Sequence, residues 1–186
     1  MNIGFAMCGS FCTFSQVFPI MELLSRDYTV TPIFSEAAYS LDTRFGKARE
    51  HIELAEDICK SKPIHTIVQA EPIGPRKLFD ILLIAPCTGN TLAKLAHGIA
   101  DGPVTMATKS HLRNGRPVLI AVSTNDALNT AAENIGRLMA RKHYYFVPFR
   151  QDDPRQKPSS MVADFSRIPM ALTEALDSRQ IQPLIM

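Results

Sequence analysis

The sequence of 186 residues lacks the features that mark export, membrane insertion or nucleic-acid binding. No apolar run approaches the length of a membrane helix, and no cation precedes Arg26, so the charged start of a signal peptide is missing. The formal net charge is only +2, and no run of Lys or Arg exceeds two residues, which argues against a nucleic-acid partner. These absences predict a cytoplasmic protein that binds neither membrane nor nucleic acid.

Metal-binding and nucleotide-binding motifs are also missing. The four cysteines have no Cys-x-x-Cys spacing, which disfavours a zinc site or a disulfide framework and fits a reducing compartment. No Gly-x-Gly-x-x-Gly fingerprint occurs. Gly4 and Gly9 have the glycine spacing of a Walker P-loop, but Ser10 stands where the lysine is needed and Gly4 falls inside the first predicted strand. ATP and NAD in their usual modes are therefore disfavoured, whereas a mononucleotide with one phosphate remains open.

The most informative stretch that is present runs from Asp80 to Thr91. Its apolar run, residues 81–85, suits a strand buried on both faces of a parallel sheet. Pro86 and Gly89 break the strand, and a helical apolar stripe follows. The first N–H groups of such a helix have no internal partner, which favours an anion there. The alternative is an ordinary strand-to-helix turn with Thr88 as its N-cap.

Strand and helix patterns alternate along the chain. Apolar runs predict strands at residues 3–7, 28–34, 64–68, 81–85, 117–122 and 144–147. Helices are expected to begin near residues 13–16, 42–43, 88–90, 101–103, 130–133 and 163. The loop at residues 148–160 is long enough to form a lid. This alternation predicts an α/β fold over residues 1–186: a single doubly wound, Rossmann-like parallel-sheet domain with helices on both faces.

Small and polar residues follow four of the predicted strands, and ligands of doubly wound sheets bind beyond the carboxyl ends of the strands. These residues are Gly9-Ser10, Ser35, Thr88-Gly89-Asn90-Thr91 and Ser123-Thr124-Asn125. Glycine lets a backbone approach a phosphate closely, and hydroxyl groups can donate hydrogen bonds to it. A second polar group, Arg137, Arg141, Lys142 and His143, gathers where a helix is predicted to end. That position favours a solvated helix terminus over a phosphate site.

Three motifs in the same order resemble the flavoprotein family of FMN-dependent cysteine decarboxylases. They are Gly9-Ser10, the segment 86–91 (Pro-Cys-Thr-Gly-Asn-Thr) and the segment 121–128 (Ala-Val-Ser-Thr-Asn-Asp-Ala-Leu). Segments 42–46, 70–72, 112–114, 123–128 and 145–149 are similar, more closely, to a family of flavoprotein-like synthase components from spore-forming bacteria. Members of that family act with a separate NAD(P)-binding protein, the A component of the same synthase, to oxidise a tetrahydrodipicolinate-type precursor to dipicolinate.

The resemblance implies roles for individual residues. The FMN phosphate contacts would come from Gly9, Ser10, Thr88, Gly89, Asn90 and Thr91. Ser35 would lie beside the phosphate or ribityl chain, Ser123 near the flavin ring, and Asn125 at a substrate carboxylate. The catalytic histidine of the decarboxylases has no counterpart, because residues 71–75 read Glu-Pro-Ile-Gly-Pro. We add Arg44 as a ligand for a dicarboxylate substrate, the alternative being a surface arginine.

Three functions are compatible with these features. The first is an FMN-binding oxidoreductase component that acts with the NAD(P)-binding A component on a small dicarboxylate, in the mother cell of a spore-forming bacterium. The second is a scaffold for the A component that has lost its cofactor. The third is an FMN-dependent decarboxylase of a cysteinyl substrate. The resemblance also implies a homo-oligomer, and no metal is expected.

Overall fold

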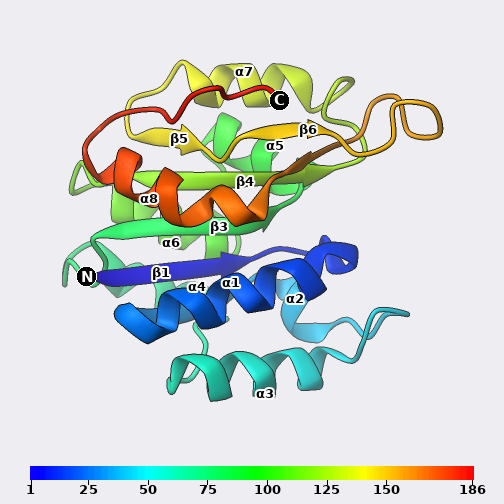
Figure 1. Ribbon diagram of the computed structural model, residues 1–186. Coiled ribbons are helices and arrows are strands. Elements are labelled where there is room, and N and C mark those ends of the chain that lie inside the picture. The colour runs from blue at the N-terminus through cyan, green and yellow to red at the C-terminus, as the bar shows by residue number, and fades with distance from the viewer.

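Seven strands form one sheet in the order β2-β1-β3-β4-β7-β6, and β5 also pairs with β4 (Figure 1). The structure is a computed structural model that describes residues 1–186. The strands are β1 (Asn2–Met7), β2 (Thr29–Phe34), β3 (Ile81–Cys87), β4 (Val118–Thr124), β5 (Tyr144–Phe146), β6 (Phe149–Gln151) and β7 (Met161–Ala163). The first five strands pair in parallel, whereas β7 runs antiparallel to both β4 and β6.

The centre of the sheet is built from continuous apolar segments. Every residue of β3 is buried, and so are Ile3 in β1 and Ile120 in β4. Strands that are covered on both faces need such segments, because helices pack against each side of a parallel sheet. The expected doubly wound fold is confirmed, with an antiparallel hairpin added at one edge.

Helices cover both faces of this sheet. They are α1 (Phe14–Asp27), α2 (Glu36–Ser40), α3 (Ala48–Cys59), α4 (Ile67–Ala70), α5 (Gly89–His97), α6 (Pro103–Leu112), α7 (Ala132–Met139) and α8 (Ile168–Leu176). Figure 1 shows α1 and α8 on one face, α5 and α6 on the other, and α3 beyond the β2 edge. None of these helices has both the length and the apolar character needed to cross a bilayer.

The prediction of a strand at residues 64–68 is wrong. Ile64 makes only an isolated bridge to Ile33, and the chain then enters α4. The Thr66 hydroxyl accepts a hydrogen bond from the Gln69 N–H, and the Gln69 side chain accepts one from the Thr66 N–H. This capping box starts a helix within an apolar run too short to show its period.

The helix expected to begin at residues 42–43 starts instead at Ala48. A tight turn from Thr43 to Gly46 precedes it, and Gly46 has φ +135°, which favours glycine. The Asp42 carboxylate accepts a hydrogen bond from the Ala48 N–H, six residues later. The short helix α2, which the sequence analysis missed, begins after Ser35.

The segment expected to be loop, residues 148–160, contains strand β6. Together with β7 this strand forms a hairpin, and Asp152 to Ser160 connect the two. The last helix begins at Ile168, because residues up to Ala163 belong to β7. Strands of three residues carry too little alternation to be recognised from sequence.

Thr13 and Thr130, in the segments 13–16 and 130–133 where helices were expected to begin, do not cap the helices that follow them. The Thr13 hydroxyl donates to the Ser10 carbonyl oxygen at 2.8 Å, and α1 continues through Pro19. The Thr130 hydroxyl donates to the Asp126 carboxylate, so α7 starts at Ala132 without a side-chain cap. In both cases the threonine hydroxyl donates a hydrogen bond to a nearby loop residue, and it does not accept one from the helix.

Candidate functional site

Two adjoining pockets open where the strand order reverses. Strand β1 has β2 on one side and β3 on the other, so the turns after β1 and β3 diverge at this point. Gly9 in the first turn and Thr88 in the second line both pockets. We call them the α5 pocket (about 340 Å³) and the hairpin pocket (about 490 Å³). A switch point of this kind is the usual ligand site of open α/β sheets.

The α5 pocket brings together Gly9, Ser35, Thr88, Asn90 and Thr91, all of them candidates from the sequence. Ser35 caps α2 by accepting from the Ala38 N–H at 3.2 Å, and Thr88 caps α5 by accepting from the Thr91 N–H at 3.4 Å. A hydroxyl that accepts an N–H retains its own proton. The turn is therefore capped as the alternative interpretation required, and the Ser35 hydroxyl remains able to donate to an anion.

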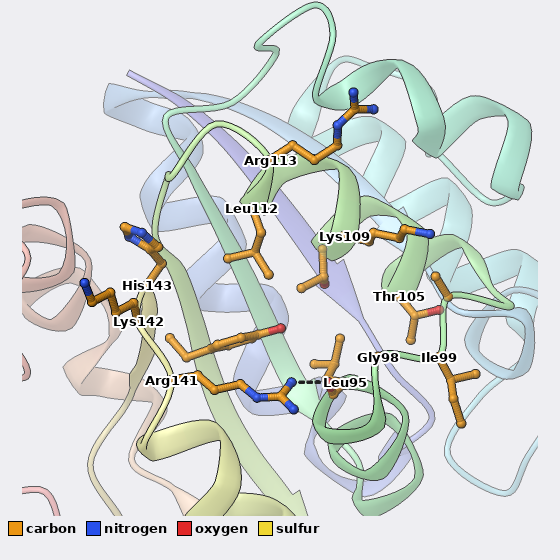
Figure 2. A pocket seen from close by; sticks show the side chains of 13 residues that line it. Leu95, Gly98, Ile99, Thr105, Lys109, Leu112, Arg113, Arg141, Lys142 and His143 are labelled. Atoms are coloured by element: carbon orange, nitrogen blue, oxygen red, sulfur yellow. Dashed lines mark hydrogen bonds between the residues drawn. The ribbon is translucent and has the colours of Figure 1, made fainter.

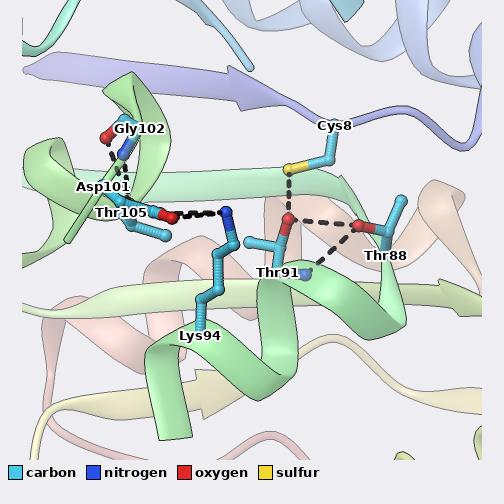
Figure 3. Close-up of polar contacts among 7 residues, drawn as sticks. All are labelled: Cys8, Thr88, Thr91, Lys94, Asp101, Gly102 and Thr105. Atoms are coloured by element: carbon cyan, nitrogen blue, oxygen red, sulfur yellow. Dashed lines mark hydrogen bonds and ion pairs between the residues drawn. The ribbon is translucent and has the colours of Figure 1, made fainter. Parts of the chain in front are cut away.

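Thr91 lines this pocket, but its hydroxyl is already hydrogen-bonded within the chain. Its hydroxyl donates to Cys8 Sγ at 3.3 Å and lies 3.1 Å from the Thr88 hydroxyl oxygen (Figure 3). The thiols of Cys8 and Cys87 are buried beneath it. Burial raises the pKa of Cys87 well above its ordinary value, so this thiol stays neutral. In this environment Cys87 packs as a small apolar residue.

Lys94 and Asp101 also line the α5 pocket, and the sequence analysis missed both. The Lys94 ammonium lies 2.9 Å from each oxygen of the Asp101 carboxylate (Figure 3). This contact lowers the pKa of Asp101. Lys94 follows Asn90 by four residues on α5, so helical spacing could have identified it.

The hairpin pocket brings together Ser10, Ser123 and Asn125 with the β6–β7 hairpin. The hydroxyl oxygens of Ser10 and Ser123 are 2.7 Å apart, although the two residues are separated by 113 positions. The side-chain oxygen Oδ1 of Asn125 accepts from the Ser160 hydroxyl at 3.4 Å, so the side-chain N–H groups of Asn125 remain available to a ligand.

Lys157 is the only cation that lines the hairpin pocket, and the sequence analysis did not propose it. Its ammonium pairs with the Asp152 carboxylate at 3.3 Å, on the same loop. Burial raises the pKa of Asp152, but its polar contacts, among them the one from Lys157, outweigh burial and lower it. Lys157 lies within the loop predicted to form a lid. A basic residue in that loop is the sequence signal that could have identified it as a pocket residue.

Gly89 lines neither pocket but holds two turns together. A Cβ at this position would lie 2.6 Å from Asp126 Oδ1 and 2.8 Å from Thr124 Oγ1. Hydrogen bonds from Thr124 and Thr130 lower the pKa of Asp126. Because glycine has no Cβ, the turn after β4 can pack directly against the start of α5 at Gly89.

Arg44 also lies outside both pockets. It is exposed at the tip of the Thr43–Gly46 turn, with its guanidinium carbon 4.8 Å from the centre of the Phe45 ring. Phe45 itself lines the hairpin pocket. The structure thus places Lys157, rather than Arg44, in the pocket wall.

No histidine lines either pocket. Residues 71–75, where the decarboxylases carry their catalytic histidine, are fixed against α6 instead. The Ser110 hydroxyl donates to the Glu71 carbonyl oxygen at 2.5 Å and accepts from the Gly74 N–H at 2.7 Å. The site therefore offers hydroxyl, amide and ammonium donors, but no imidazole for proton transfer.

The fold and this donor-rich switch point agree with the family match. Residues 1–171 match the family described as Flavoprotein, so the chain belongs to that family. Over 185 residues it is 44% identical to the B component of dipicolinate synthase from Bacillus subtilis (strain 168), covering 99% of this chain and 92% of that protein. The resemblance inferred from the motifs is thereby confirmed.

Solved structures give the same result. The crystal structure of the dipicolinate synthase B component from Bacillus halodurans C superposes with a TM-score of 0.91 at 42% identity, covering 100% of this chain and 95% of that one. The FMN-dependent cysteine decarboxylase SpaF has a TM-score of 0.71 at 23% identity, covering 94% and 97%. The second likeness shows the shared fold alone.

Proposed function

We propose that this chain is the flavin-binding component of a dipicolinate synthase. It would act with the A component of dipicolinate synthase, an NAD(P)-binding partner, to oxidise a tetrahydrodipicolinate-type precursor to dipicolinate in the cytoplasm during sporulation. The observation that carries this proposal is the end-to-end likeness to the B component from Bacillus subtilis. The two pockets at the switch point supply a place for the flavin and for the substrate.

The α5 pocket has the donors that a phosphate monoester needs. The Ser35 hydroxyl proton and the exposed Asn90 amide make no hydrogen bond within the chain, and the Thr88 hydroxyl would turn its proton from Thr91 to the ligand. Gly9, in the turn after β1, also lines this pocket. The N-terminal end of α5 adds its partial positive charge. We infer that these residues hold the phosphate of FMN.

The hairpin pocket would hold the flavin ring and the substrate. FMN, when bound, supplies the capacity to accept a hydride. Ser10 and Ser123 would contact the ring as a hydrogen-bonded pair, and Asn125 would donate its amide protons to a substrate carboxylate. Lys157 would neutralise part of the charge of a dicarboxylate. Residues 148–160 would act as the lid proposed from the sequence, with Arg44 contributing only if its turn moves inward.

Two alternatives are distinguished by residue content and by one variant. Decarboxylation of a cysteinyl substrate is disfavoured because neither pocket contains a histidine. A cofactor-free scaffold for the A component would retain the fold without using the donors of the α5 pocket. The double variant Thr88→Val/Asn90→Leu removes two of those donors and therefore separates a flavin-binding protein from a scaffold.

The test is to co-purify the chain with the A component, add FMN, and record the visible spectrum after gel filtration together with synthase activity. We expect flavin absorbance and activity in the wild type, and loss of both in Thr88→Val/Asn90→Leu. The matched control is Thr66→Val/Asn129→Leu, which also removes one helix cap and one exposed amide but lies outside both pockets. Full activity of the first double variant without bound flavin would favour the scaffold.

We also propose a homo-oligomer. A Flavoprotein-like neighbour, DmrB of Burkholderia xenovorans, is described as a cubic protein cage, and at 19% identity that likeness is one of fold. Light scattering coupled to gel filtration tests this proposal, since a mass near 20.6 kDa would contradict it.

A further inference from the structure

A third pocket lies at the opposite end of α5 from Gly89 and Thr88 (Figure 2). We call it the basic pocket. Its volume is about 490 Å³, within the range of small-molecule sites, and it is bounded by the end of α5, by α6 and by the residues that lead into β5. It shares Thr105 with the α5 pocket and no residue with the hairpin pocket. Neither flavin binding nor substrate binding, as proposed above, uses it.

One part of its wall is apolar. Leu95, Ile99 and Leu112 line it, and Ile99 remains 47% exposed. Figure 2 shows Leu112 pointing toward the cavity from α6, on the side opposite Leu95. Tyr144 completes the lining, and burial raises the pKa of its phenol, which therefore stays a neutral hydrogen-bond donor. Such a wall suits a flat, apolar body.

The rest of the wall is cationic and contains no acidic residue. Lys109, Arg113, Arg141 and Lys142 line it, and none of the four pairs with a carboxylate anywhere in the chain. Arg141 is held in place, since its guanidinium donates to the carbonyl oxygens of Leu95 at 3.2 Å and Ala96 at 2.7 Å.

The position of His143 fixes this cationic segment beside the cavity. His143 has φ +71°, a conformation that non-glycine residues rarely adopt. Its carbonyl oxygen accepts from the Val118 N–H at 2.8 Å, at the start of β4. The backbone that carries Arg141 and Lys142 is thus anchored to the sheet. Strain of this kind is found disproportionately at ligand sites.

The sequence analysis favoured a solvated helix end for these cations, and the cavity changes that interpretation. Arg141 and Lys109 are themselves exposed, but they border an apolar hollow of ligand size (Figure 2). Like charges gathered around such a hollow repel one another until an anion is present. From this geometry we infer that the basic pocket binds an anion with a flat apolar body, of the aromatic carboxylate class.

The contacts expected for such a ligand follow from the wall. Its carboxylate would receive hydrogen bonds from Lys109 and from the outer face of Arg141, and its ring would lie between Leu95, Leu112 and Ile99. A bare anion would meet only the cations, and a neutral ring would meet only the apolar side chains. Both parts of the ligand are therefore needed for affinity.

Isothermal titration calorimetry on the full chain tests this inference, with isophthalate as the probe. Isophthalamide, which has the same ring without charge, and inorganic phosphate, which has charge without a ring, are the comparison ligands. We expect saturable binding of isophthalate, and at least tenfold weaker binding of the other two. Phosphate binding as tightly as isophthalate would overturn the inference, as would the absence of isophthalate binding.

Three variants locate the bound probe. Lys109→Glu reverses a cation of the basic pocket and should weaken isophthalate binding at least tenfold. Arg137→Ala removes a neighbouring cation that is paired with Glu133 outside the pocket, and should leave binding unchanged. Asn125→Ala alters the hairpin pocket, so any weakening that it causes reports isophthalate bound there rather than in the basic pocket. Weakening by Asn125→Ala but not by Lys109→Glu would place the dicarboxylate in the hairpin pocket and refute a site in the basic pocket.

Discussion

Replacing Gly89 by alanine would place a methyl group against the side chains that hold the turn after β4. The new Cβ would lie 2.6 Å from Asp126 Oδ1 and 2.8 Å from Thr124 Oγ1, closer than carbon and oxygen can approach. Overpacking of this kind costs about 1–3 kcal/mol. The intrinsic helix preference of alanine over glycine offsets at most about 1 kcal/mol. Taking the middle of the cost range, about 2 kcal/mol, we expect the free energy of unfolding to fall by about 1–2 kcal/mol.

Gly136→Ala is the matched control for this change. Gly136 also lies within a helix, α7, and a Cβ there would meet no atom within 4 Å. Its substitution should raise the free energy of unfolding by up to about 1 kcal/mol. Urea denaturation followed by circular dichroism compares the midpoints of the two variants with that of the wild type. The two variants should shift in opposite directions.

A double-mutant cycle identifies the cause of the loss at Gly89. In an Asp126→Ala background the nearest atom is absent, so Gly89→Ala should cost at least about 1 kcal/mol less than in the wild type. A Gly89→Ala variant as stable as the wild type would refute the packing that joins α5 to the turn after β4. Equal costs in the two backgrounds would show that Asp126 is not the neighbour responsible.

Three further predictions use other parts of the molecule. Lys157→Ala should raise the KM for a dicarboxylate about fivefold, the loss of roughly 1 kcal/mol for an exposed cation, whereas Lys62→Ala should not, as steady-state kinetics would show. Leu83→Ala, in the buried centre of β3, should lower the free energy of unfolding by about 2–5 kcal/mol, and Val68→Ala, which is 79% exposed, by far less; equal losses in urea titrations would contradict the assigned core. Burial lowers the pKa of His111 to about 4, so the unfolded chain binds a proton that the folded chain excludes between the two pKa values. Stability should therefore fall as pH drops from about 6.5 to about 4, by roughly 1.4 kcal/mol per pH unit, and His111→Gln should remove this dependence in urea titrations at a series of pH values.

The central strands and the switch-point turns could be predicted because their signals are local. Residues 81–85 form a continuous apolar run, and strand alternation with helices specifies the parallel sheet. Thr88 follows that run directly, so its place at a strand end could be inferred before its neighbours in space were known. Ser10 and Ser123 could be assigned to one edge of the sheet for the same reason, although their 2.7 Å contact could not.

The remaining features depend on contacts between distant or competing groups. The segment from Ile64 forms a helix because Thr66 and Gln69 cap each other, and the apolar run alone favoured a strand. Lys157 reaches the hairpin pocket only because β6 and β7 fold back as a hairpin too short to recognise from sequence. The exclusion of Gly89 from both pockets arises from Asp126, which lies 37 positions further along the chain.

The position of Gly9 and Thr88 in both pockets has a consequence for how the two halves of the site can change. Each residue belongs to a common wall, with the α5 pocket on one side and the hairpin pocket on the other. A substitution in this wall that suits a new substrate would also change the shape of the α5 pocket, for which we propose the phosphate. A new substrate specificity would therefore arise more readily from substitutions in the hairpin loop, which lines only the hairpin pocket, than from substitutions at Gly9 or Thr88.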